Sequence, residues 1–328
     1  MIKIGQIGIG HNHGEAKMIT VRKFPELFEV IGYAEEDEEW VKKRGALGAY
    51  ADLKRMSVHE IIEKSDAVLI ECDVWNLTKY AKLCVEAGRH IHMDKPASGT
   101  LEEYRELLKT AKSRNLVVQL GYMYRYNPAV KKCFELIKNG DLGEIYSVNA
   151  EMSTFHPAQY KKWLSNFNGG IMYILGCHLV DLVVYLLGEP KKITSFFKRS
   201  GLDGIDVEDN NLAVLEYEKA LARIYVSSVE VNGWGRRQFV ISGSKGTVEI
   251  KPIENTVNMT YAYNGQGLPY EDIKTAIDLK DVPKECRYDD MIMDFAAYIS
   301  SEKQNPFTYD HDLAVHKVMT CICEMGKP

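Results

Sequence analysis

Residues 3–14 read KIGQIGIGHNHG, an apolar run that ends in two glycines one residue apart. The run predicts a β-strand, and the pattern over residues 15–22 predicts a helix directly after the turn. In such a unit Gly8 permits a tight reversal, and Gly10 lets the backbone approach a pyrophosphate that the first N–H groups of the helix face. The third glycine of the dinucleotide-binding fingerprint would fall where His13 stands, and the next glycine comes one residue late. The stretch therefore predicts dinucleotide binding, with an ordinary turn after a strand as the alternative.

A second predicted strand, residues 28–34, is followed directly by Glu35. Its distance along the chain from the glycine turn is close to that at which a carboxylate meets the adenosine ribose diol. A carboxylate there would repel a 2′-phosphate, so the sequence favours NAD over NADP. Alternatively, Glu35 begins the acidic run 35–39 at a helix N-terminus, where the helix dipole favours negative charge. Both interpretations can hold together.

The bulk properties describe a globular protein of more than one domain. A chain of 328 residues is too long for one ordinary core. A change of pattern at Gly121 predicts one domain over residues 1–121 and another over 122–328. The net charge of −5 argues against nucleic acid or an anionic membrane as partner. No apolar run reaches the roughly 18 residues of a membrane span, and the chain begins directly with a predicted strand, so we expect a cytoplasmic protein.

The cysteines favour reduced thiols over a disulfide framework or a metal site. Seven are present, an odd number, at positions 72, 84, 133, 177, 286, 321 and 323. None forms a CxxC pair, and Cys321 and Cys323 fall in a helical pattern, where their side chains diverge. We find no cluster with convincing metal-ligand spacing and predict no metal site.

Strands and helices alternate up to Gly121. Further strands are predicted over residues 67–70, 90–93 and 117–120, with helices over 76–87 and 101–113. This rhythm predicts a doubly wound parallel sheet of the Rossmann type, in which ligands bind beyond the carboxyl ends of the strands.

The pattern after Gly121 is dominated by strands. After a helix over residues 128–138, strands are predicted over 145–151, 192–197, 211–217, 220–229, 237–242 and 247–250. Helices are predicted over 170–187, 289–301 and 310–325, and surface loops over 255–285. Runs of strands without intervening helices predict a second, α+β domain with a large, mostly antiparallel sheet.

The first catalytic candidate is Lys95, in Asp94-Lys95-Pro96 directly after the strand 90–93. That place is the carboxyl edge of the sheet, where the nicotinamide half of a dinucleotide would lie. A lysine there can donate a hydrogen bond to a substrate oxygen, and desolvation can lower its pKa until it passes a proton. A surface turn is the alternative.

The second candidate is His178, in an apolar helical segment. Asp181 lies three residues on and shares its helix face. His178 could act as general acid or base for an alcohol proton, or it could be a core histidine satisfied by Asp181 or by a carbonyl.

Weaker candidates complete the set. His11, Asn12 and His13 are assigned to the cofactor-binding turn, where the two histidines could touch phosphate or cap the helix. Trp163 is a candidate wall of a substrate pocket.

Taken together, these stretches resemble the Gfo/Idh/MocA family of oxidoreductases, which includes inositol dehydrogenases and glucose–fructose oxidoreductase. The likeness covers nearly the whole chain and rests on Gly8-x-Gly10 with Glu35, Asp94-Lys95-Pro96, residues 121–129 (GYMYRYNPA) and residues 169–181 (GGIMYILGCHLVD). The resemblance implies a nicotinamide cofactor in the first domain, a substrate pocket between domains, and Lys95 and His178 at the reacting carbon. It also implies that Arg125 and Asn127 line that pocket, and that the protein is a homodimer or homotetramer.

Two positions depart from the family pattern. Ile174 stands where the family usually has a carboxylate four residues before the histidine, and residues 72–76 (CDVWN) replace the family's Thr-Pro-Asn-like loop.

From the resemblance as a whole, we expect an NAD(P)-dependent dehydrogenase of a sugar, sugar derivative or cyclitol. Two alternatives stay open: a glycosidase or epimerase that recycles bound NAD, and a dinucleotide-binding sensor that has lost its chemistry.

Overall fold

The computed structural model describes residues 1–254, 259–264, 272–277 and 288–325. Contacts divide the chain into two compact units, of which the first contains residues 1–123 and 286–313 and the second contains residues 124–285 and 314–328. The return of residues 286–313 to the first unit was not foreseen from the sequence. The two domains expected at 1–121 and 122–328 stay a prediction. No helix of the described part of the chain is long and apolar enough to cross a membrane.

The first unit is built on a five-stranded sheet in the order β2-β1-β3-β4-β5, in which every pair of neighbours is parallel. Its strands are β1 (Ile2–Ile7), β2 (Phe28–Ala34), β3 (Ala67–Ile70), β4 (His90–Met93) and β5 (Val118–Leu120). All their carboxyl ends therefore meet at one edge. The predicted parallel sheet is confirmed.

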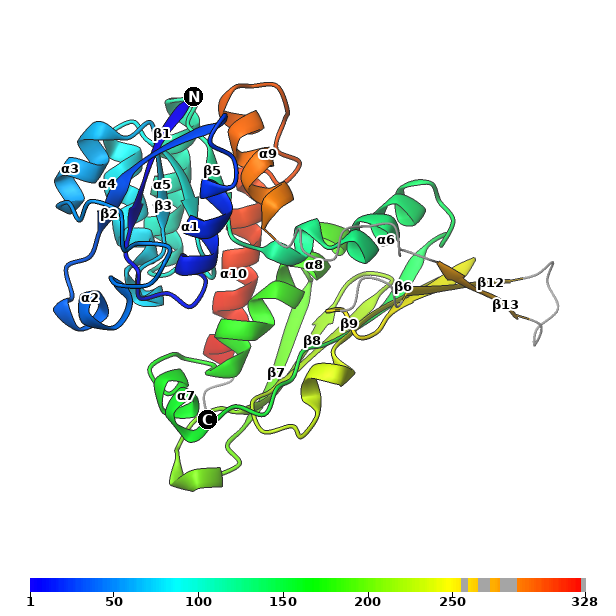
Figure 1. Cartoon of the computed structure of the whole chain (residues 1–328). Coiled ribbons are helices and arrows are strands. Elements are labelled where there is room, and N and C mark those ends of the chain that lie inside the picture. Colours follow the sequence, from blue (N-terminus) through cyan, green and yellow to red (C-terminus); the bar gives the residue numbers. More distant parts are fainter. Residues whose placement is uncertain (255–258, 265–271, 278–287, 326–328) are drawn as a thin grey trace. The chain divides into compact units, whose positions relative to one another are not determined.

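Helices cover both faces of this sheet (Figure 1). They are α1 (Gly14–Arg22), α2 (Glu38–Arg44), α3 (Val58–Lys64), α4 (Leu77–Glu86), α5 (Leu101–Ser113) and α9 (Asp289–Ile299). On one face α1 and α9 contribute Val21 and Phe295 to a core with Ile4 and Leu69 of the strands. On the other face α3 packs Ile61 against Gly5, and α4 contacts β3, β4 and α5. The sheet is thus doubly wound, as predicted.

The second unit contains an eight-stranded sheet in the order β13-β12-β11-β10-β6-β9-β8-β7. Its strands are β6 (Ile145–Glu151), β7 (Lys192–Lys198), β8 (Asn210–Glu216), β9 (Leu221–Ser227), β10 (Gln238–Gly243), β11 (Gly246–Ile250), β12 (Met259–Asn264) and β13 (Asp272–Ile277). Only the β6–β9 pair is parallel among these described strands. The mostly antiparallel sheet is confirmed. The prediction of loops over 255–285 is wrong where β12 and β13 extend the sheet; the rest of that stretch lies outside the described residues.

The helices of the second unit include α6 (Pro128–Lys138), α7 (Ala158–Leu164) and α8 (Cys177–Leu187), while α10 spans Tyr309–Met325. Short 3₁₀ turns lie at Val74–Asn76, Met123–Tyr126, Leu202–Gly204 and Gly233–Arg236. The predicted helix 170–187 begins with a π-helical segment, Met172–Gly176, before α8 continues it. Residues 177–184 of α8 are all buried, and α8 contacts β6 and β9. Because this helix is apolar nearly all round, burial against the sheet is what stabilises it.

Candidate active site

The turn after β1 is packed tightly against the end of β3. Gly8 has φ +84°, and a Cβ there would lie 2.3 Å from the Cys72 Cα, so only glycine fits without moving the backbone. The His11 N–H donates to the Glu71 carbonyl at 3.0 Å. A Cβ on Gly10 would lie 2.7 Å from Trp40 Nε1, so in this structure the space beside Gly10 holds an indole ring. Its predicted role beside a pyrophosphate stays a prediction.

Arg44 on α2 forms hydrogen bonds to the same turn. Its guanidinium donates to the carbonyls of Ile9 and His11 at 3.1 and 2.6 Å and to Asn12 Oδ1 at 3.3 Å. It also lies over the Trp40 ring, 5.0 Å from the centroid. The sequence analysis missed Arg44, which nothing in its local pattern marks.

A pocket of about 380 Å³ opens beside the turn, at the carboxyl ends of β1, β2 and β3. Glu35 is fixed at its rim, because its carboxylate accepts the Ile9 N–H at 2.9 Å and the Asp37 N–H at 3.0 Å. The lining includes four carboxylates, those of Glu35, Glu36, Asp37 and Asp73, and a single lysine, Lys79. Burial raises the pKa of Asp73. The pocket is therefore acidic.

A buried ammonium lies below the turn. Lys17 of α1 is fully buried, and its Nζ lies 3.2 Å from Glu71 Oε1, 3.2 Å from Asp94 Oδ2 and 2.7 Å from His92 Nε2. His92 Nδ1 lies 2.7 Å from Gln119 Oε1, which can only accept, so Nδ1 carries the proton and Nε2 accepts from Lys17. Burial and the Lys17 charge lower the pKa of His92 to about 3.

The ionisable side chains of this cluster differ in how strongly their surroundings favour the charged form. Burial alone would lower the pKa of Lys17, but Asp94 and Glu71 outweigh it and raise the pKa above its ordinary value. Burial also opposes ionisation of Asp94, yet His11, Lys17 and His13 hold the pKa of that carboxyl well below its usual range. Burial raises the pKa of Glu71, which Lys17 offsets only in part. Lys17 and Asp94 thus form the charged pair.

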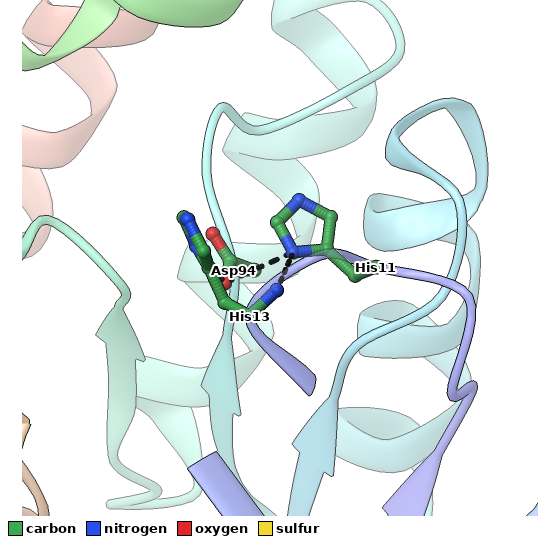
Figure 2. A group of neighbouring side chains, drawn as sticks. All are labelled: His11, His13 and Asp94. Carbon is green, nitrogen blue, oxygen red and sulfur yellow. Dashed lines mark hydrogen bonds and ion pairs between the residues drawn. The ribbon is translucent and has the colours of Figure 1, made fainter. Parts of the chain in front are cut away.

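His11 and His13 both turn their imidazoles to Asp94 (Figure 2). The Nδ1 atoms of His11 and His13 lie 3.3 and 3.0 Å from Asp94 Oδ2. Burial lowers the pKa of His11 to about 3 and also lowers that of His13, so both rings are neutral near pH 7. His13 is the N-cap residue of α1, but its side chain makes no capping hydrogen bond.

Lys95 follows Asp94 at the end of β4 and is 5% exposed. Its backbone N–H donates to Asp94 Oδ1 at 2.7 Å. The Asp94 carboxylate therefore contacts Lys17, both histidines of the turn and the backbone of Lys95. The sequence analysis quoted Asp94 but gave it no role, and it missed Lys17, Glu71 and His92. For Glu71 and Asp94 the sequence did contain a signal, because each comes directly after a parallel strand.

In the second unit, Asp181 pairs with Arg125. The Arg125 Nε donates to both carboxylate oxygens at 3.1 and 2.9 Å, and its Nη2 donates to Oδ1 at 2.6 Å. Both side chains are buried, so this is a desolvated bidentate pair. The His178 ring packs edge-on against Tyr124, with centroids 4.8 Å apart. Asp181 is thus engaged by a guanidinium, which the sequence pattern did not indicate.

Asn127 has a structural task. Its Oδ1 accepts the Ala129 and Val130 N–H groups at the start of α6, and its Nδ2 donates to the Ile253 carbonyl at 2.8 Å. Its predicted contact with substrate stays a prediction.

Trp163 of α7 belongs to a run of aromatic rings in the second unit. Its ring lies 5.2 Å from that of Tyr160 and 4.8 Å from that of Phe167. Tyr160 in turn stacks on His156 at 4.3 Å. These four residues are half-buried, and a run of aromatic rings suits a flat, partly apolar ligand face, as a sugar ring has.

Comparisons with known proteins agree with this architecture. Residues 2–122 match the family model described as "Oxidoreductase family, NAD-binding Rossmann fold", and residues 130–249 match the model described as "GFO/IDH/MocA C-terminal domain". The Myo-inositol 2-dehydrogenase of Thermotoga maritima is 27% identical over 286 residues, which are 82% of this chain and 81% of that protein.

Two further comparisons give a cofactor-linked relative and a solved structure. The scyllo-inositol 2-dehydrogenase (NADP(+)) of Bacillus subtilis is 25% identical over 179 residues, 52% of this chain and 50% of that protein. The chain spans about half the length of several such relatives. A levoglucosan dehydrogenase in complex with NADH and levoglucosan has a TM-score of 0.83 at 18% identity, over 99% of this chain and 97% of that chain. This last likeness is one of fold.

Proposed function

Because this chain belongs to the Gfo/Idh/MocA family of oxidoreductases, we propose that it is an NAD-dependent dehydrogenase of a sugar, sugar derivative or cyclitol. The bound coenzyme would supply the hydride acceptor for a carbinol carbon. The observation that carries the proposal is the acidic pocket at the carboxyl ends of β1–β3, which lies beside a glycine turn too tight for any side chain. Relatives named as inositol dehydrogenases support the substrate class.

The residues of the first unit fit a dinucleotide. Gly8, Gly10 and the turn residues His11, Asn12 and His13 would hold the pyrophosphate at the start of α1. Glu35 would accept hydrogen bonds from the adenosine ribose diol, because its carboxylate keeps lone pairs beyond the two that the backbone occupies.

Lys95 and His178 would divide the proton chemistry. We assign to Lys95 the task of donating a hydrogen bond to the reacting oxygen, and to His178 that of taking the hydroxyl proton. Arg125 and Asp181, locked to each other, would orient substrate hydroxyls with rigid groups. Trp163, Tyr160 and Phe167 would face the sugar ring.

The simplest test measures absorbance of the reduced nicotinamide with NAD and a panel of sugars and cyclitols. We expect NADH to accumulate with at least one of them. Product without net NADH would support a recycling glycosidase or epimerase instead. Binding of NAD without any product would support a sensor, an alternative favoured by Ile174, which is apolar and 5% exposed where the family has a carboxylate.

The coenzyme preference should depend on Glu35. Replacing Glu35 with Gln keeps an oxygen acceptor for the Ile9 N–H but removes the charge that repels a 2′-phosphate. Hydrogen bonds to charged groups contribute about 1.5–3 kcal/mol, so we expect the ratio of kcat/KM for NAD to that for NADP to fall by about tenfold or more. Glu39→Gln, an exposed site on α2, is the matched control. An unchanged ratio in Glu35→Gln would contradict the assignment.

We also propose that the protein is a cytoplasmic homodimer or homotetramer that associates through the outward face of its second sheet. Phe196, Leu212 and Tyr225 form an apolar row across β7, β8 and β9, and Phe196 is 52% exposed. The described cysteines are all free thiols, as in a reducing compartment. Light scattering after size-exclusion chromatography tests the assembly, and a monomer at micromolar concentration would count against it.

A further inference from the structure

Two imidazoles and a carboxylate converge where β1 and β4 end. The histidines belong to the turn assigned to the pyrophosphate, but none of the proton transfers proposed above uses their contact with Asp94. His11 Nδ1, His13 Nδ1 and one carboxylate oxygen of Asp94 all lie within 4.8 Å of one another. The two nitrogens are 3.3 and 3.0 Å from Asp94 Oδ2. In a tetrahedral site with nitrogen and oxygen ligands at about 2.0–2.1 Å, neighbouring ligand atoms are about 3.3–3.4 Å apart. The spacing is thus close to that of a metal site.

A fourth group points to the same place. Glu71 is fully buried, and its Oε2 has no hydrogen-bond partner among the described residues. This oxygen lies 3.7 Å from His11 Nδ1. A buried carboxylate oxygen without a donor is costly unless a cation or a proton compensates it. It is therefore a second indication of a cation or a proton at this position.

We propose that His11, His13 and Asp94, with Glu71 as the fourth ligand, bind a divalent transition-metal ion. Two imidazoles with carboxylates favour Zn²⁺ or Co²⁺ over Mg²⁺ and Ca²⁺, which prefer oxygen ligands alone. The inference goes beyond the proposed function, because no step assigned to Lys95 or His178 uses a metal.

Lys17 leaves room for the ion. Its ammonium contacts Glu71 through Oε1, whereas the oxygen nearest to His11 is Oε2. The same ammonium lies 3.2 Å from Asp94 Oδ2, so Lys17 and the ion would share the two carboxylates. The third contact of Lys17, to His92, is fixed in turn by Gln119. The ion would lie on the side of the turn histidines, opposite this network.

The ligand atoms are accessible and oriented for the ion. Side chains of His11 and His13 are 10% and 27% exposed, so an ion can enter from solvent. His11 Nδ1 accepts the His13 N–H at 3.3 Å, which places its lone pair at Nδ1 and its proton at Nε2. Metal binding would replace this long hydrogen bond and the one between His13 Nδ1 and Asp94 Oδ2 at 3.0 Å, and it would require the proton of His13 to move to Nε2.

The sequence analysis predicted no metal site, and the fold explains why. His11 and His13 are two residues apart in sequence, but Asp94 and Glu71 reach them only because β3 lies next to β1 and β4 next to β3. A spacing rule applied to the linear chain cannot find such a set.

The test uses the full chain, stripped of metals with a chelator and without any dinucleotide. Titration with Co²⁺ should give the visible absorption of a tetrahedral ion at a single ion per chain, and Zn²⁺ should displace it. His11→Gln and His13→Gln should each weaken Co²⁺ binding by at least about 10–100-fold, the loss seen when even a group that supports a ligand is removed. His59→Gln, an exposed histidine beside Glu63 on α3, should bind as the parent does.

Two further results decide the matter. Zn²⁺ should raise the Tm of the parent and of His59→Gln but not of His13→Gln, because an ion that binds only the folded state stabilises it. Should the parent bind Co²⁺ no more tightly than His11→Gln and His13→Gln do, or give only the weak spectrum of an octahedral, hydrated ion, a proton and not a metal occupies the cluster and the proposal is wrong. Neither readout depends on dehydrogenase activity, so the proposed function can fail or hold independently.

Discussion

Replacing Lys95 with Met is expected to lower kcat by about 10²–10⁴-fold, the range attributed to a positioned proton donor, and to leave the Kd for NAD nearly unchanged. Lys95 is 5% exposed, and Met has a similar length without the ammonium. Met therefore keeps the apolar stem of the side chain in place. Any change in folding is measured separately from the loss of turnover.

The measurements that separate these effects are steady-state rates, fluorescence titration with NADH, and urea denaturation of both proteins. Lys109→Met on α5, whose side chain is 74% exposed, serves as the matched control and should keep the parental rate. If Lys95→Met oxidises the same substrate as fast as the parent, Lys95 is not the group that polarises the oxygen. If it only weakens NADH binding, Lys95 is a cofactor contact and not a catalytic one.

Asp94 explains why Lys95 is well placed for such a role. Its Oδ1 accepts the Lys95 backbone N–H, while its Oδ2 faces Lys17 and His13. The backbone that carries the lysine is therefore fixed by a buried, charge-assisted network, and a residue held in this way loses little entropy on meeting a substrate.

The sequence predicted the architecture well wherever hydrophobic period and turn residues agreed. All five parallel strands follow from short apolar runs, each with a glycine or polar residue after it. The order of the strands was not predicted and comes from the structure. The resemblance to the Gfo/Idh/MocA family is confirmed by family models over both parts of the chain.

α2, of which only the N-terminus was indicated, and α3, which was missed, are short and owe their stability to their ends. α2 has no buried residue; Asp37 caps it by accepting the Glu39 N–H at 2.8 Å, and its charges suit the helix dipole. α3 begins with a capping box between Ser57 and Glu60, a signal that was present in the sequence and could have been used. β12 and β13 lie among glycines and prolines, which indicate loops, and pairing with β11 overrides that tendency.

In the candidate site, too, some residues could be found from the sequence and others could not. The place of Glu35 and Lys95 at the carboxyl edge of the sheet could be predicted, because Glu35 directly follows β2 and Lys95 comes two residues after β4. Their roles stay predictions. Lys17 could not be predicted, because a lysine within a helix is usually exposed. Only the fold shows that it faces two carboxylates that come from the ends of β3 and β4.

Lys17 should accordingly contribute more to stability than an exposed lysine at the end of the same helix, such as Lys23. Lys17→Met would leave Asp94 ionised without its ammonium in a fully buried place, and removing one partner of a buried pair costs about 3–5 kcal/mol. We expect the free energy of unfolding, measured with urea at pH 7, to fall by that amount. Lys23→Met is the matched control, because Lys23 follows the same helix and pairs with Asp289 at 3.0 Å but is 46% exposed, and such surface pairs contribute about 0–1 kcal/mol.

The sign of the pH dependence provides an independent check on Lys17. Its pKa is raised in the folded state, so its stabilising contribution is fully present below the ordinary pKa of lysine and is lost only as the pH rises through the higher, folded value. The gap between parent and Lys17→Met should therefore stay constant through neutral and mildly alkaline pH. Adding Asp94→Asn to Lys17→Met should restore part of the lost stability, because the buried carboxylate left without its ammonium is then removed as well. A gap below about 1 kcal/mol, or no recovery in the double variant, would mean that this ammonium does not hold the carboxylates together.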